Sequence, residues 1–148
     1  MKLCYEELSQ YKYQLTRDFS IHINLEAPDF AHELFEFSKG FLYIYTGYRW
    51  DGPSGPTFDT KENMRGALIH DVLYQSMRLG ILDQSFRDDA DRILRDLMLE
   101  DYQRDKSALQ QKWGKLRSWY YWSAVRGFAK FAAKVKAEKP RKETCLGE

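Results

Sequence analysis

Apolar and polar residues alternate along the first third of the chain. Within residues 11–25 the alternation is clearest from Phe19 onward, where every second side chain is apolar. This period of two is typical of a half-buried strand. Two further apolar segments, residues 34–37 and 41–45, flank a Ser-Lys-Gly turn at 38–40, in which the glycine can supply a positive φ. We therefore predict a β-hairpin within a small antiparallel sheet.

Helical spacing begins after a loop with two glycines and two prolines, residues 51–56. Asp59 is placed to cap a first helix, which we expect to end near Leu79. A second helix is expected from Ser85, and the short connection makes the two helices antiparallel neighbours. Residues 107–138 predict a third, long helix near the C-terminus.

This order of elements predicts the fold class. Strands come first and helices follow, which is typical of an α+β arrangement. With 148 residues, of which 43% are hydrophobic, the chain fits one domain with a sizeable core. We expect that domain to span residues 1–139 and residues 140–148 to form a disordered tail.

The composition excludes several classes of protein. No apolar run approaches the roughly 18 residues that a membrane-spanning helix needs. The N-terminus lacks the apolar segment of a secretory signal, so we expect a protein that stays in the cytosol or is packaged there into a larger assembly. Cys4 and Cys145 lie near opposite ends of the chain, and we expect both thiols to be reduced.

Charge is unevenly distributed along the chain. Residues 1–111 hold 13 Lys and Arg against 19 Asp and Glu, a net charge of −6. Residues 112–142 hold 10 Lys and Arg against one Glu, a net charge of +9, and the last six residues bring the total to +1 with two glutamates. Together with Trp119 and Trp122, this basic segment suits an anionic membrane surface or a partner protein. Nucleic acid is a less suitable partner, because no known reading motif accompanies it.

The two predicted central helices carry the candidate chemistry. His70 and Tyr74 are four residues apart and share one face of the first helix. On the second helix Asp91 lies on an apolar stripe, where a carboxylate needs a hydrogen-bonding partner. His70 or Tyr74 would be that partner, and a carboxylate that holds one imidazole nitrogen leaves the other as a general base. The alternative is that His70 is a core histidine with a purely structural role.

The sequence also indicates a cation site beside this pair. Asp71 faces another direction than His70, and Asp51 adds a second carboxylate. The loop that follows Asp51 contains Gly52 and Gly55, whose carbonyl oxygens would complete a set of hard ligands of the kind that calcium prefers. A base, a cation and water together could cleave an ester or an amide.

These motifs resemble the active site of phospholipase A2, above all the small bacterial and fungal enzymes and the phospholipase domain of parvovirus capsid proteins. The matching segments are the loop from Tyr48 to Gly55, His-Asp-Val-Leu-Tyr at 70–74, and Ala-Asp at 90–91. The resemblance implies that His70 activates water, that Asp71 and the loop bind calcium, and that Asp91 with Tyr74 orients His70.

The whole chain also resembles a family of similar length and unknown function that is common in tailed bacteriophages and prophages. Four blocks carry this likeness in order: Asp-Gly-Pro-Ser-Gly-Pro at 51–56, Ala-Leu-Ile-His-Asp-Val-Leu-Tyr at 67–74, Ala-Asp at 90–91, and Tyr-Trp-Ser-Ala-Val-Arg at 121–126. It implies a phage protein in the host cytoplasm or the virion. Two functions follow as hypotheses: a calcium-dependent hydrolase of membrane lipid esters, or a non-catalytic virion or tail component that docks phage structural proteins through its C-terminal helix.

Overall fold

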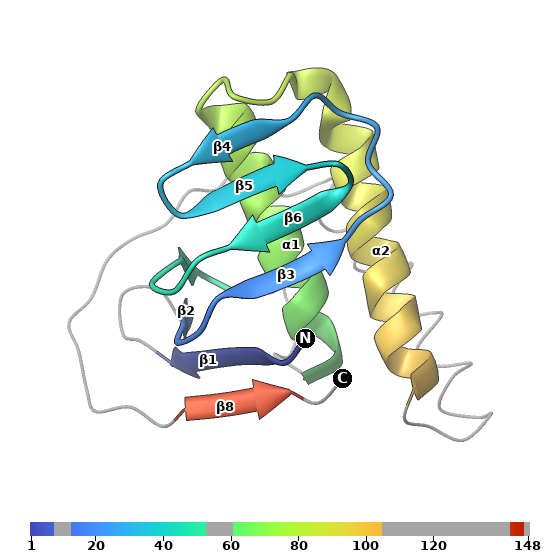
Figure 1. Cartoon of the computed structure of the whole chain (residues 1–148). Helices are drawn as coiled ribbons and strands as arrows, with labels where there is room; N and C mark the ends of the chain where they lie inside the picture. Colours follow the sequence, from blue (N-terminus) through green and yellow to red (C-terminus); the bar gives the residue numbers. More distant parts are fainter. Residues whose placement is uncertain (8–12, 53–60, 105–142, 147–148) are drawn as a thin grey trace.

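The computed structural model describes residues 1–7, 13–52, 61–104 and 143–146, and it contains two antiparallel sheets and two long helices (Figure 1). The α+β class predicted from the sequence is confirmed. The strands are β1 (Leu3–Glu7), β2 (Tyr13–Leu15), β3 (Phe19–His22), β4 (Phe30–His32), β5 (Phe35–Ser38), β6 (Phe41–Ile44), β7 (Arg49–Trp50) and β8 (Glu143–Leu146).

The first sheet joins the two ends of the chain. Its strand order is β7-β2-β1-β8, with each neighbouring pair antiparallel. In the pairing of β1 with β8, Cys4 lies opposite Cys145, and the two form a disulfide. The expectation of reduced thiols is therefore wrong: strand pairing brings together two cysteines that are 141 residues apart in the sequence. Residues 143–146, which we assigned to a disordered tail, form an edge strand instead.

The second sheet contains the predicted hairpin. Its strand order is β3-β6-β5-β4, again antiparallel throughout. Strands β5 and β6 are joined at Lys39 and Gly40, whose φ angles are 51° and 82°. A side chain at Gly40 would be strained by this φ, and its Cβ would lie 2.9 Å from Nε2 of His22. The glycine in the predicted turn is thus required twice, by the backbone and by the neighbouring strand.

Helices α1 (Lys61–Arg78) and α2 (Arg87–Arg104) are the predicted antiparallel pair (Figure 1). Helix α1 is followed by Gly80 with φ 70°, in the left-handed region that commonly ends a helix. Before α2 comes a short 3-10 helix, Gln84–Phe86, whose first turn is capped by Asp83 through its bond from the Ser85 N–H. The cap lies two residues earlier than the Ser85 start that we predicted. Asp59 and the predicted third helix lie outside the described residues.

The hydrophobic core lies between the sheets and the helices. Helix α1 contributes Leu68, Ile69, Val72 and Leu73, each with 0% of its surface exposed. They belong to one cluster with buried residues of both sheets and of α2. Because α1 carries both this apolar face and His70, packing of the core fixes how the histidine is presented to α2. Within the described ranges, no helix is long and apolar enough to cross a membrane.

Candidate active site

The predicted contact between the two helices is present. Nε2 of His70 on α1 lies 3.0 Å from Oδ1 of Asp91 on α2. The Tyr74 hydroxyl, one turn further along α1, donates to the same carboxylate oxygen at 2.7 Å. The rings of His70 and Tyr74 are 4.1 Å apart between centroids, with an angle of 34° between their planes. One aspartate on α2 therefore holds two adjacent aromatic side chains of α1 in fixed orientations.

A further residue extends this network to the surface. Nε of Arg87 donates to the Tyr74 hydroxyl at 3.1 Å, and its guanidinium carbon lies 5.9 Å from the centre of the tyrosine ring. We did not predict a role for Arg87. The signal was available, because Arg87 precedes Asp91 by four residues and so lies one turn away on the same face of α2.

The network is deeply placed but not closed off. Asp91 exposes 1% of its surface and His70 exposes 9%, while Tyr74 is half-buried and Arg87 is exposed. A charged carboxylate at such depth is costly unless it is hydrogen-bonded, and the two donors from α1 offset that cost. This need for partners explains why the apolar stripe of α2 admits an aspartate at this position.

The pKa values of the three groups reflect this arrangement. Burial acts to lower the pKa of His70, but interactions with Asp71 and Asp91 outweigh it and leave the pKa raised. Burial acts to raise the pKa of Asp91, but the bonds from His70 and Tyr74 outweigh it and leave it lowered. Burial and the bond to Asp91 together raise the pKa of Tyr74 to about 12. Around neutral pH Asp91 is thus a carboxylate and Tyr74 keeps its proton.

The second nitrogen of His70 faces Asp71. Nδ1 lies 3.9 Å from Oδ1 of Asp71, which is too long for a direct hydrogen bond but close enough for electrostatic attraction. The Asp71 side chain is 27% exposed, so this side of the imidazole is the more accessible one. When Asp91 accepts a hydrogen bond from Nε2–H of the neutral imidazole, Nδ1 carries the lone pair, and a water molecule between Nδ1 and Asp71 would lie within reach of both.

Comparison with known proteins identifies neither a family nor a function for this chain. No family model, curated protein or solved structure matches the chain. The likenesses to phospholipase A2 and to a phage family therefore remain predictions, and the site is interpreted from its own geometry.

The residues predicted to bind calcium are only partly described. Asp51 is exposed, Gly52 is buried with φ 76°, and Gly55 lies outside the described residues. Over the described ranges, no group of three or more His, Cys, Asp or Glu side chains could hold a metal ion. A site built mainly from backbone carbonyls would not form such a group, because it needs only one or two carboxylates. The oxygen donors of Asp71, Asp51 and the glycine loop are of the type that suits calcium.

Proposed function

We propose that this protein is a calcium-dependent hydrolase of the phospholipase A2 type that cleaves an ester of a membrane lipid. The observation that carries the proposal is the paired contact of Asp91 with Nε2 of His70 and with the Tyr74 hydroxyl. It fixes the imidazole by one nitrogen and leaves the other beside Asp71. A histidine held in this way supports the role of a general base, because one imidazole nitrogen is oriented and the other is left to accept a proton.

The reaction would proceed through water. Nδ1 of His70 takes a proton from a water molecule, and the water oxygen bonds to the ester carbonyl carbon. The resulting tetrahedral intermediate breaks its bond to the alcohol oxygen, and the imidazolium returns the proton to that leaving oxygen. The products are a carboxylic acid and an alcohol. Asp91 stabilises the imidazolium while it exists, and Tyr74 keeps Asp91 in place.

Asp71, Asp51 and the carbonyl oxygens of Gly52 and Gly55 are the residues that would hold calcium. A bound calcium ion supplies polarisation of the ester carbonyl, which neutral water attacks too slowly otherwise. The lipid surface itself would be met by residues 112–142, whose net charge of +9 favours anionic headgroups. In the phage setting that the sequence suggests, the substrate would be a lipid of the host membrane.

A second function is favoured by the depth of the histidine. Only 11% of the His70 side chain is exposed, and the same network that could support catalysis also ties α1 to α2. A non-catalytic virion or tail component would retain this network for stability alone. The two functions differ in whether Nδ1 ever exchanges a proton with a substrate.

The decisive experiment measures fatty-acid release from vesicles that contain phosphatidylglycerol and phosphatidylcholine. With calcium present, we expect release by the wild type and none by His70→Asn. His22→Asn, which changes an exposed histidine on β3, should keep full activity. If the wild type and His70→Asn release equally little fatty acid, the hydrolase proposal fails and the structural function is favoured.

Calcium binding is tested without reference to activity. Calcium should raise the melting temperature of the wild type, because a ligand that binds only the folded state stabilises it. Asp71→Asn should abolish this rise, whereas Asp89→Asn, on the outer part of α2, should preserve it. An equal rise in both variants would show that calcium binds elsewhere.

A further inference from the structure

The last described strand is attached to its sheet along one side only. In the order β7-β2-β1-β8, strand β8 lies at the end, so among the described strands it pairs with β1 alone (Figure 1). The disulfide of Cys4 with Cys145 joins the same two strands at directly opposite positions. One covalent bond and the backbone hydrogen bonds to β1 are thus the contacts that join β8 to the sheet.

The backbone hydrogen bonds between β1 and β8 lie on either side of the disulfide. The Cys4 carbonyl accepts from the Thr16 N–H at 3.2 Å, so the backbone groups of Cys4 point toward the β2 side. Because these directions alternate along a strand in an antiparallel sheet, the backbone groups of Leu3 and Tyr5 point toward β8. Their partners by register are Leu146 and Thr144. Each residue has one N–H and one carbonyl, so β1 makes at most four such bonds to the described strand β8.

So few hydrogen bonds hold a short strand only weakly. Strand β8 has four residues, which gives at most one of these bonds for each residue that is ordered. The net contribution of one backbone hydrogen bond is on average smaller than the entropy cost of fixing the backbone of one residue. The disulfide changes this balance, because it keeps β8 beside β1 before any hydrogen bond forms. The pairing of β8 therefore depends on the disulfide.

The disulfide lies on the face of the first sheet that points away from the core. Side chains along a strand alternate between the two faces. Leu3 and Tyr5 belong to the hydrophobic core cluster, so Cys4 between them points to the opposite face. Cys4 is buried, with 2% of its surface exposed, whereas Cys145 is exposed at the edge of the sheet. A reductant in solution therefore meets Cys145 first, and it does not have to open the core.

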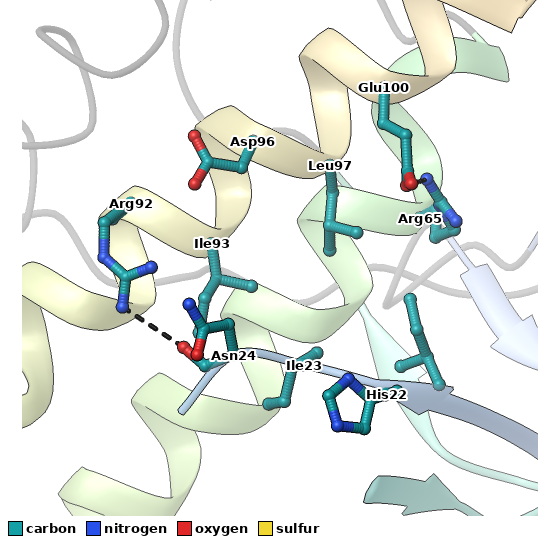
Figure 2. A pocket seen from close by; sticks show the side chains of 10 residues that line it. His22, Ile23, Asn24, Arg65, Arg92, Ile93, Asp96, Leu97 and Glu100 are labelled. Atoms are coloured by element: carbon teal, nitrogen blue, oxygen red, sulfur yellow. Dashed lines mark hydrogen bonds and ion pairs between the residues drawn. The ribbon is translucent and has the colours of Figure 1, made fainter. Parts of the chain in front are cut away.

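Other described elements are joined by contacts in which β8 takes no part. The Tyr5 ring lies 5.2 Å from the Tyr13 ring and 5.8 Å from the Trp50 ring between centroids, which ties β1 to β2 and β7. Figure 2 shows the groove between β3 and α2, where Arg92 donates to the Asn24 carbonyl at 3.2 Å. These contacts would remain if β8 left the edge of the first sheet.

We propose that the Cys4–Cys145 disulfide is a redox-operated latch, which a dithiol reductant opens to release β8 from β1 while the other described elements stay folded. A thiolate of the reductant bonds to Sγ of Cys145, the bond between the two cysteine sulfurs breaks, and Cys4 leaves as a thiolate that takes up a proton. The second thiolate of the reductant then bonds to the first reductant sulfur, and Cys145 leaves as a thiolate that is protonated in turn. Two electrons pass to the cysteines, and the reductant ends as a disulfide.

The open latch uncovers a sheet edge that the closed latch covers. The backbone groups of Leu3 and Tyr5 lose β8 as their partner, and β1 becomes an edge strand that another strand can join. Disulfides persist in oxidising surroundings and are reduced in the cytosol, so the state of this edge follows the compartment. The proposal is independent of the hydrolase proposal, because neither cysteine belongs to the network of His70, Tyr74 and Asp91.

The test is hydrogen exchange of single amides, measured by NMR for the oxidised protein and again after reduction with dithiothreitol. Reduction should speed the exchange of the Leu3 and Tyr5 amides at least about tenfold, the equivalent of about one net hydrogen bond. The Glu6 amide is the matched control in the same strand, because it points toward β2 as Cys4 does. Its exchange should change less than about twofold, and so should that of Ile69 in the core of α1.

The variant Cys145→Ser opens the latch without a reductant and replaces only the exposed cysteine. Its Leu3 and Tyr5 amides should exchange rapidly with and without dithiothreitol. The proposal is overturned if complete reduction leaves these two amides protected, because β8 then stays paired without the disulfide. Equal acceleration at Ile69 also overturns it, since the disulfide then holds the whole fold. A disulfide that dithiothreitol cannot reduce in the folded protein is the third contrary result.

Discussion

Removal of the Asp91 carboxylate should destabilise the protein more than any other single change at the site. Asp91→Ala takes the shared acceptor from His70 and from Tyr74, both of which lie against α2. It leaves an imidazole with 9% exposure facing a small cavity. Breaking a buried pair by removal of one partner costs about 3–5 kcal/mol. For a chain of this size that corresponds to a fall in melting temperature of roughly 6–20 °C.

The measurement is urea and thermal unfolding at neutral pH, followed by circular dichroism. Asp89→Ala is the matched control, because Asp89 lies two residues earlier on the same helix with its side chain 41% exposed. Among the residues that the structure describes, Asp89 forms an ion pair with Arg92 at 2.7 Å. An exposed pair at this spacing is worth about 0.3–0.5 kcal/mol. If the two variants differ by less than about 1 kcal/mol, Asp91 does not hold the helices together and our account of the network is incorrect.

Three further predictions concern the pH response, the helix contact and the disulfide. The pKa of His70 is higher in the folded protein than in the unfolded chain, where it is about 6.5. The stability that this difference adds is complete below the unfolded pKa and is lost as the pH rises through the folded pKa. The free energy of unfolding of the wild type, but not of His70→Gln, should therefore fall in that range. Gly66→Ala should cost about 1 kcal/mol, since the new Cβ would lie 3.2 Å from the Leu94 carbonyl oxygen and overpacking outweighs the gain in helix propensity; a stabilised variant in urea unfolding would contradict this. Joint replacement of Cys4 and Cys145 by serine should cost roughly 4–5 kcal/mol under oxidising conditions, and detection of two free thiols in the native wild type would refute it.

Local patterns predicted the parts of the fold that depend on nearby residues. The hairpin followed from a glycine between two apolar segments, and the helix pair followed from apolar periodicity with a short connection. The contact of His70 with Asp91 was predictable because a carboxylate on an apolar stripe needs a partner on the neighbouring helix. The hairpin and the contact of His70 with Asp91 join residues that are at most 21 positions apart, and the helix pair follows from a short connection between neighbouring segments.

The parts that could not be predicted depend on distant pairing. Nothing in the sequence near Cys145 signals that residues 143–146 form a strand, since the segment becomes one only by pairing with β1. The groove beside β3 has the same origin, because it exists only where the edge of the second sheet meets α2. The spacing of residues in the sequence also does not predict how the loop after Asp51 would bind calcium. Carbonyl ligands depend on the direction of the backbone rather than on residue type.

The titration of His70 should affect both enzymatic activity and stability, and the two candidate functions differ in which of these changes with pH. A general base works only when it is neutral, so hydrolysis should increase with pH as His70 loses its proton. The same loss of a proton weakens the ion pair with Asp91 and lowers stability, because the pKa of His70 is raised in the folded state. A hydrolase therefore shows activity that rises with the same midpoint at which the His70 ring signals titrate in NMR spectra. A structural network shows the change in stability with no activity at any pH. Comparison of the two midpoints in one protein preparation thus separates a histidine that transfers protons to substrate from one that only binds two helices together.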